Sequence, residues 1–367
     1  MKSNTSLNLN TMKSLDSYVD TLYPIDCGLG CNPLGAPDAV ADFWAHYEGS
    51  KTERYYDFSQ IVELSVKVGD YTRIPPERIF FSNGSMAMLS NIFFKLFSEK
   101  PKRMLGIGPQ FVQAVSEWRL SGGTYEAVAF GPQADPERVF DRLMEKIKAE
   151  RPAVVYIDNP NNPTGLVVSI GAIKQLVQMC KEVDAFLIVD EAYADYLPLE
   201  CSAMNLTHDF SNLIVTRTFS KGLGLASIRI GYCVVHEELI GSIQKIICPF
   251  SLSKTSMDLA CYVLPGIETF LTRSREHVRA LKNEMTESFR QKGITIWPSH
   301  ENIPIFLAHH AETQLFAWLS NLGILTESGK HFAATHPDMS DHYCRVRVPD
   351  SKTHLIHLIY RFKNSKL

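Results

Sequence analysis

Between about residues 78 and 250, short apolar runs alternate with amphipathic stretches, and this alternation restricts the fold of the chain more than any other feature. It is typical of an α/β domain in which helices cover a mostly parallel sheet. Several runs are continuously apolar, as expected for strands covered on both faces. We therefore expect a mostly parallel seven-stranded sheet between helices. Its strands are predicted at 79–82, 104–107, 125–130, 153–157, 186–190, 213–216 and 230–235.

The pattern changes after Ser253 and indicates a second, smaller α+β domain. A chain of 367 residues also exceeds the size at which one hydrophobic core usually stops growing. We predict an N-terminal arm that includes part of the small domain at 1–45, a large domain at 46–255 and a small C-terminal domain at 256–367. Helices are expected in the large domain at 85–97, 139–150, 170–183 and 237–247. In the small domain we expect a long helix at 257–292, strands at 303–308 and 343–348, and helices at 312–321 and 353–362.

Composition argues against several classes of protein. No apolar run approaches the length needed to cross a bilayer, and the first twenty residues lack the apolar segment of a secretion signal, so a cytoplasmic location is expected. Lys and Arg number 37 against 40 for Asp and Glu, without a basic stripe that could follow a nucleic-acid backbone. Eight cysteines are scattered without zinc-ligand spacing, so we expect reduced thiols and no metal site.

Polar motifs follow several of the predicted strands. In open α/β sheets, ligands bind beyond the carboxyl ends of the strands. Residues 83–86 (NGSM) open a helix, and their free amides and the hydroxyl of Ser85 suit a phosphate, although Ser85 is equally an ordinary helix cap. Residues 158–165 (DNPNNPTG) form a turn in which the amide of Asn162 can donate to a phenolic oxygen.

Asp190 ends the predicted strand at 186–190 and lies three residues before Tyr193. A buried carboxylate at this point needs a cationic partner or a proton. A protonated pyridine nitrogen would supply that partner, and the carboxylate would then support an electron sink.

Lys221 lies in the segment 218–224 (TFSKGLG), directly after a buried strand. A lone lysine in a glycine-containing loop is usually a solvated surface charge. This lysine is flanked by hydroxyls and is followed eight residues later by Arg229, which could hold a phosphate with two hydrogen bonds. Lys221 is therefore a candidate for the type of amine that forms a Schiff base.

In this order and spacing, NPNNPTG, DEAY and SK followed by an arginine form a specific signature. From about Asn32 to Arg345 the chain resembles the fold-type I pyridoxal-phosphate enzymes of the class I/II aminotransferases. The resemblance is strongest to the histidinol-phosphate aminotransferase branch, which includes threonine-phosphate decarboxylase-like enzymes. It implies a pyridoxal 5′-phosphate (PLP) transferase of amino-acid metabolism, a cytoplasmic homodimer with its active sites at the subunit interface.

The resemblance also implies a role for each matching residue. Lys221 would form the Schiff base and shuttle the proton at the substrate's α carbon, with Asp190 and Tyr193 as its catalytic partners. Tyr55 would reach the phosphate of the neighbouring subunit. The other cofactor-binding residues would be Gly84, Ser85, Met86, Phe111, Asn162, Thr218 and Arg229. The substrate would contact Asn162, Gly30 and Arg345, which grips the α-carboxylate, with Arg347 as the alternative.

Two departures concern the substrate. In the histidinol-phosphate branch the segment before Asn-Pro is rich in carboxamides and acids that contribute to substrate recognition. Here residues 26–35 read DCGLGCNPLG and lack those polar substrate contacts, and Met86 replaces an acidic residue. We therefore expect an aminotransferase of a small amino acid or amino-phosphate. A decarboxylase of the threonine-phosphate type, or a lyase or cyclase that acts on hydroxyarginine like capreomycidine synthase, remains an alternative.

Two further alternatives belong to other classes. The first is a non-catalytic amine-binding protein on the same fold, which the presence of Lys221 disfavours. The second is a dinucleotide enzyme, whose fingerprint is incomplete because Gly222 and Gly224 have no third glycine and no downstream acid in register.

Overall fold

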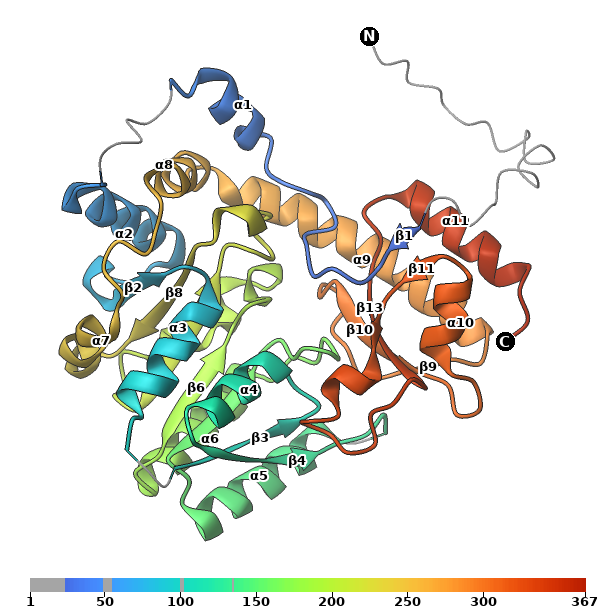
Figure 1. Ribbon diagram of the computed structural model, residues 1–367, viewed down its shortest axis with the longest axis horizontal. Helices are drawn as coiled ribbons and strands as arrows, with labels where there is room; N and C mark the ends of the chain where they lie inside the picture. The colour runs from blue at the N-terminus through green and yellow to red at the C-terminus, as the bar shows by residue number, and fades with distance from the viewer. Residues whose placement is uncertain (1–23, 49–54, 100–101, 134) are drawn as a thin grey trace.

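The computed structural model describes residues 24–48, 55–99, 102–133 and 135–367, and a seven-stranded sheet lies within its larger part (Figure 1). The strand order is β2-β8-β7-β6-β5-β3-β4. Only β8 runs antiparallel to its neighbours, so the prediction of a mostly parallel seven-stranded sheet is confirmed. The strands are β2 (Ile79–Ser82), β3 (Arg103–Gly108), β4 (Thr124–Ala129), β5 (Val154–Asp158), β6 (Phe186–Asp190), β7 (Leu213–Thr218) and β8 (Gly231–Val235).

Helices cover both faces of this sheet because successive side chains of each strand point to opposite faces. In β6, Leu187 and Val189 belong to one hydrophobic cluster and Ile188 belongs to another. The first cluster packs against α1 (Ala39–His46), α2 (Phe58–Thr72), α5 (Pro136–Glu150), α6 (Ile170–Glu182) and α8 (Lys254–Val263). The second packs against α3 (Ser85–Asn91), α4 (Val112–Leu120) and α7 (Ile240–Ile246).

The C-terminal part is built on a separate hydrophobic cluster and an antiparallel sheet of order β12-β13-β10-β9. An N-terminal strand, β1, pairs in parallel with β11, so the beginning of the described chain lies against this part (Figure 1). The elements are β1 (Ile25–Asp26), α9 (Ile267–Gln291), β9 (Thr295–Ile296), β10 (Ile305–His309), α10 (Leu315–Asn321), β11 (Ile324–Leu325), β12 (Glu327–Ser328), β13 (Tyr343–Arg347) and α11 (Lys352–Lys363).

The prediction of a single long helix at 257–292 is wrong. Two helices, α8 and α9, occupy this stretch and are separated at Pro265 and Gly266. Gly266 has φ +91°, a left-handed conformation that glycine adopts without steric cost and that a continuous helix cannot contain. The helices α1, α2 and α4 were not predicted. None of the helices in the described ranges is both long and apolar enough to cross a bilayer.

Candidate active site

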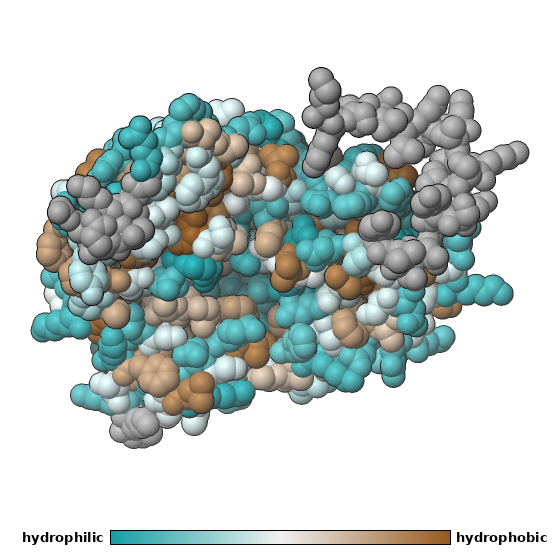
Figure 2. Space-filling view, turned by 45° about the horizontal axis from the view of Figure 1, so that its top comes forward, coloured by the Kyte–Doolittle hydropathy of each residue, from teal (hydrophilic) through white to brown (hydrophobic). Residues whose placement is uncertain are grey.

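A cavity of about 250 Å³ lies at the carboxyl ends of β5, β6 and β7, and Figure 2 looks onto the hollow surface between the sheet and the C-terminal part. It brings together most of the residues that the sequence singled out. Its lining consists of Gly30, Ser85, Met86, Phe111, Asp158, Pro160, Asn162, Asp190, Ala192, Tyr193, Thr218, Ser220, Lys221, Ala226, Arg229 and Arg345. Strands whose carboxyl ends meet at one edge explain why segments far apart in sequence converge here.

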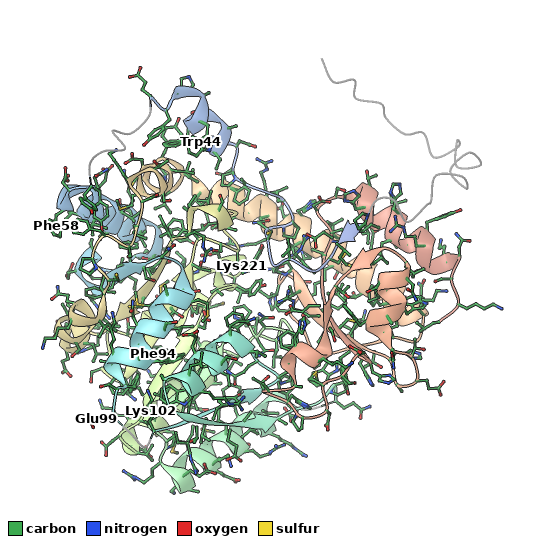
Figure 3. All side chains as sticks on the ribbon, viewed as in Figure 1. Trp44, Phe58, Phe94, Glu99, Lys102 and Lys221 are labelled. Atoms are coloured by element: carbon green, nitrogen blue, oxygen red, sulfur yellow. The ribbon has the colours of Figure 1, made fainter. Side chains whose placement is uncertain are left out.

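Lys221 lies three residues beyond β7, near the centre of the molecule (Figure 3). Its ammonium group lies 5.6 Å from the centre of the Tyr193 ring. The backbone of Gly30 closes over both side chains, because a Cβ atom at Gly30 would stand 2.7 Å from Lys221 Nζ and 2.6 Å from the Tyr193 hydroxyl. A side chain at position 30 would therefore displace the two groups expected to do the chemistry.

Asp190, at the end of β6, is buried and accepts hydrogen bonds from two neighbouring hydroxyls. Tyr156 Oη donates to Oδ2 at 3.2 Å, and Thr216 Oγ1 donates to Oδ1 at 3.2 Å. Burial raises the pKa of Asp190 to about 6, although these two hydrogen bonds and the charge of Lys221 oppose the shift. A cation held beside this carboxylate would lower its pKa again and would gain a charged partner inside the protein.

Hydroxyl groups and an arginine form a second polar group in the lining of the cavity. Arg229 Nη1 donates to Ser220 Oγ at 3.2 Å, and Thr218 Oγ1 donates to the same oxygen at 3.0 Å. Gly84 leaves room for the guanidinium, since a Cβ at Gly84 would stand 2.6 Å from Arg229 Nη2. Ser85 begins α3 directly after Gly84, and the helix start has no side-chain cap. The group is cationic and rich in donors, as a phosphate site requires.

Of the two arginines on β13, Arg345 lines the cavity and Arg347 does not. Arg345 Nη1 donates to Asn162 Oδ1 at 3.2 Å, which links β13 to the loop after β5. Arg347 instead binds the backbone oxygen of Asp26 at 2.7 Å and forms an ion pair with its carboxylate at 3.2 Å. Arg347 therefore ties the N-terminal strand to β13.

Asp158 is a pocket residue to which the sequence reasoning gave no role. Its Oδ2 accepts from the amides of Phe111 at 3.1 Å and Asn162 at 2.8 Å, and its Oδ1 accepts from Asn161 Nδ2 at 3.0 Å. Burial is the main reason that its pKa rises to about 7. Asp158 ends β5 as Asp190 ends β6, so the rule that led to Asp190 could also have found it. Ser220 was likewise named only as a neighbour of Lys221.

Tyr55 lies outside the cavity and is 82% exposed, with its ring 4.9 Å from that of Phe250. The expectation that Tyr55 reaches the cofactor phosphate of a neighbouring subunit stays a prediction.

The loop that carries Lys221 rests on a buried ionic cluster. A Cβ at Gly222 would stand 2.3 Å from Asp195 Cβ, so the loop lies directly on Asp195. Asp195 Oδ1 accepts from Arg217 Nη2 and from Tyr71 Oη, both at 2.6 Å. Arg217 Nε also lies 3.8 Å from the buried carboxylate of Glu191.

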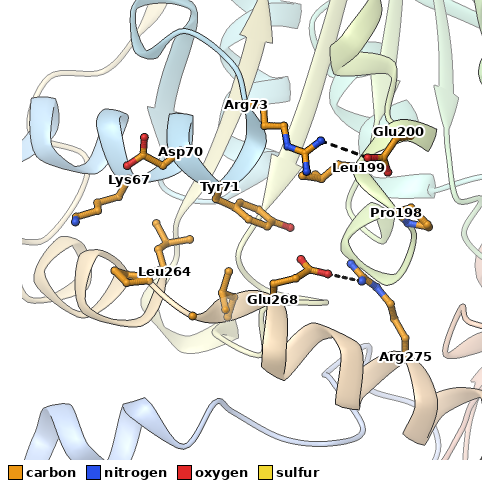
Figure 4. A pocket seen from close by; sticks show the side chains of 13 residues that line it. Lys67, Asp70, Tyr71, Arg73, Pro198, Leu199, Glu200, Leu264, Glu268 and Arg275 are labelled. Atoms are coloured by element: carbon orange, nitrogen blue, oxygen red, sulfur yellow. Dashed lines mark hydrogen bonds and ion pairs between the residues drawn. The ribbon is translucent and has the colours of Figure 1, made fainter.

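A second cavity of about 560 Å³ lies beyond this cluster, and Tyr71 and Arg275 project toward it (Figure 4). Its rim carries the ion pairs Arg73–Glu200 and Arg275–Glu268. It contains none of the residues around Lys221, so it is not part of the site at the sheet edge.

We expect Arg217→Met to lower the free energy of unfolding by about 3–5 kcal/mol, because the buried carboxylates of Asp195 and Glu191 would lose their cation. Denaturant unfolding measures this loss. Arg73→Met is the matched control: it breaks an exposed ion pair of 3.4 Å and should cost less than about 1 kcal/mol. Equal losses in the two variants would contradict a supporting role for the buried cluster.

Comparisons with known proteins agree with this geometry. The family described as aminotransferase class I and II matches residues 29–355. A histidinol-phosphate aminotransferase of Halalkalibacterium halodurans is 30% identical over 301 residues, which cover 82% of this chain and 79% of that protein. The crystal structure of a histidinol-phosphate aminotransferase from Sinorhizobium meliloti in complex with PLP superposes with a TM-score of 0.80 at 18% identity, over 99% of each chain.

A second solved structure is an L-threonine-O-3-phosphate decarboxylase from Porphyromonas gingivalis, with a TM-score of 0.74 at 17% identity over 93% of this chain and 98% of the other. At this identity, the likeness concerns the fold alone. Fold and site together define a PLP-dependent enzyme of fold type I. The chain belongs to the aminotransferase class I and II family, and the prediction of a PLP-dependent aminotransferase is confirmed.

The residues present fit PLP chemically. The cofactor combines an aldehyde, a phosphate and a pyridine nitrogen. The cavity offers an amine at Lys221, a cationic donor group at Arg229 and a buried carboxylate at Asp190. Gly30 and Gly84 keep the space beside Lys221 and Arg229 free of side chains.

Proposed function

We propose that Lys221 is the amine that bonds to the aldehyde of PLP, and that Arg229, Ser85 and Thr218 bind its phosphate. Asp190 would hold the proton of the ring nitrogen, and Asn162 and Tyr193 would contact the phenolic oxygen. Gly84, Met86 and Phe111 would complete the cofactor site. The observation that carries this proposal is the presence of Lys221, Asp190, Arg229 and Arg345 in a single cavity.

When bound, the cofactor supplies an electron sink for the negative charge that develops at the substrate's α carbon. The chain's own residues would perform the remaining tasks. Arg345 orients the amino acid by its carboxylate, and Asn162, whose Oδ1 accepts from Arg345 Nη1 at 3.2 Å, contacts the substrate beside it. Lys221 Nζ then moves the proton at the α carbon, and the nearby Gly30 backbone keeps water away from the amine.

The substrate we propose is a small amino acid or amino-phosphate bound through Arg345, with Gly30 beside it. The relatives of this chain are histidinol-phosphate aminotransferases, and this supports an amino-phosphate as one of the two substrate classes. The cavity supplies one arginine, Arg345, beyond the group around Arg229. An aminotransferase of amino-acid metabolism fits both observations.

We also propose a homodimer in the cytoplasm. Large apolar side chains remain exposed on α1, α2 and the segment before α8, and Figure 3 places Trp44 and Phe58 on the same side of the molecule. Exposed apolar groups of this kind often mark subunit contacts. Tyr55 lies among them and would serve the partner's site. The eight cysteines form no disulfide, in agreement with a reducing compartment. The exposed side chains include Trp44, Tyr55, Phe58, Val62 and Phe250.

An isotope experiment tests the proposed reaction. The purified enzyme with PLP is incubated with nitrogen-15-labelled amino donors and a set of 2-keto acids, and mass spectrometry follows the label. Label in a new amino acid is the expected result. Loss of carbon dioxide or release of ammonia without transfer of the label would contradict amino-group transfer.

Arg345→Ala should weaken amino-acid binding by about 10- to 100-fold, since hydrogen bonds to charged groups contribute about 1.5–3 kcal/mol. The affinity of the same variant for PLP should change less than about twofold. Titration of the cofactor absorbance with the amino donor measures the first quantity, and titration with PLP the second. Arg345→Lys keeps the charge but loses the two-pronged geometry. Its affinity for the amino donor should therefore lie between those of wild type and Arg345→Ala. Unchanged donor affinity would remove Arg345 from the substrate site.

A further inference from the structure

Arg345 is already paired with a carboxylate of its own chain. Glu327 on β12 is the cross-strand neighbour of Arg345 on β13, and its Oε2 lies 2.5 Å from Arg345 Nη2. The other oxygen of Glu327 lies 3.4 Å from Nδ1 of the exposed His331. The carbonyl oxygen of Gly28 accepts from the same Arg345 nitrogen at 2.6 Å. Two oxygens therefore lie close to Nη2, while Nη1 donates to Asn162 Oδ1.

The cavity lining offers few cationic side chains that could bind a second anionic group of the substrate. Its lining contains three cationic side chains from the part of this chain that the structure describes, namely Lys221, Arg229 and Arg345. Lys221 and Arg229 are assigned to the aldehyde and the phosphate of the cofactor. The lining also contains the buried acids Asp158 and Asp190. Among the described lining residues, an anionic group on the substrate's side chain would therefore find no cation that is not already assigned to another group.

We propose that the site selects amino donors whose only anionic group is the α-carboxylate, with a neutral or cationic side chain, and that Glu327 determines this selectivity through Arg345. This inference rests on the proposed function, since it deepens the role of the same pocket. Glu327 neutralises part of the charge of Arg345, so the pair suits a single carboxylate better than a phosphate dianion or a dicarboxylate. Phosphorylated and dicarboxylic amino donors are disfavoured.

The same rule applies to the amino acceptor. Amino-group transfer runs in two halves through one pocket, so the 2-keto acid binds the same Arg345–Glu327 pair. A 2-keto acid with a neutral side chain, such as pyruvate, is therefore the better acceptor, and 2-oxoglutarate, with its second carboxylate, is the poorer one.

Pairs of molecules that differ by one charge test the rule. For wild-type enzyme with PLP, glutamine should bind at least about tenfold more tightly than glutamate, and asparagine than aspartate, a difference of about 1.4 kcal/mol. The cofactor absorbance reports this binding. O-phosphoserine, which has a phosphate in addition to its α-carboxylate, and histidinol phosphate, which has a phosphate and no carboxylate, should bind as weakly as the dicarboxylates. Equal affinities within each pair would overturn the proposed substrate class.

Unreactive acids provide a readout that does not depend on turnover. Calorimetry compares glutaramate with glutarate, which share a skeleton and lack the amino group. Glutaramate should bind at least about tenfold more tightly. If no amino acid changes the cofactor spectrum, the proposed function has failed, and the calorimetric comparison still decides the charge rule on its own. Equal binding of the two acids would contradict the rule.

Glu327→Gln keeps the shape of the side chain and removes its charge. The glutamine-to-glutamate preference should fall to about threefold or less, because Arg345 regains its full charge. Glu284→Gln is the matched control, since Glu284 is an exposed acid on α9 paired with Lys352, and it should keep the wild-type preference. An unchanged preference in folded Glu327→Gln enzyme would show that Glu327 does not set the selectivity.

Discussion

Lys221→Ala is expected to reduce amino-group transfer at least about a thousandfold, since the variant loses both the amine that bonds to the cofactor and the base at the α carbon. The neighbouring groups should stay in place. Among the described residues, the loop is held by backbone groups and not by the Lys221 side chain: Gly224 N donates to the Lys221 carbonyl oxygen at 3.0 Å, and Asn32 Nδ2 donates to that of Gly222 at 2.7 Å. Cofactor-dependent absorbance and steady-state turnover measure the result.

Lys174→Ala is a suitable control for this variant. Lys174 is an exposed lysine on α6, away from the cavity, so its removal should leave absorbance and turnover unchanged. Turnover within tenfold of wild type in folded Lys221→Ala enzyme would contradict the role given to Lys221.

Asp190→Asn should retain bound cofactor and lose about a hundredfold or more in turnover, comparable to removal of one preorganised electrostatic group from an active site. The carboxamide is neutral and cannot hold the ring nitrogen in its protonated form, which weakens the electron sink. Most phosphate contacts should remain, because Arg229 and Thr218 both donate to Ser220 Oγ, whereas Asp190 accepts from other residues, Tyr156 and Thr216. Steady-state kinetics measure the loss of turnover, and titration with PLP measures whether the cofactor is still bound.

Asp209→Asn serves as its control, since Asp209 is exposed and lies outside the cavity lining. It should change neither quantity. Full activity in Asp190→Asn enzyme would remove the argument that a buried carboxylate supports the cofactor ring.

Much of the central sheet could be predicted because strands such as β5, β7 and β8 are buried on both faces. Runs such as 186–189 are apolar throughout, and β2 and β6 have the predicted bounds. The break between α8 and α9 was missed because helical periodicity continues on both sides of Pro265 and Gly266. Helix α4 has weak amphipathic character because Trp118 is its only large buried side chain, so its pattern gave little signal.

The cofactor side of the site was predictable for a different reason. Asp190 ends a strand, and Asn162 and Lys221 each follow one closely, so their positions depend on local sequence and on the common edge of the sheet. The substrate side depends on contacts between distant segments. Glu327 meets Arg345 only through the pairing of β12 with β13, and Gly30 reaches Lys221 only because β1 pairs with β11. Neither the Glu327–Arg345 contact nor the Gly30–Lys221 contact can be predicted from a local sequence pattern.

The central claim is that the nitrogen of Lys221 bonds covalently to PLP. The most direct measurement is reduction of the enzyme with borohydride, followed by proteolysis and mass spectrometry of the peptides. We predict that the reduced cofactor is attached to the peptide containing Lys221 and to no other lysine. Attachment at another lysine, or none in enzyme that shows the cofactor's absorbance, would contradict the account.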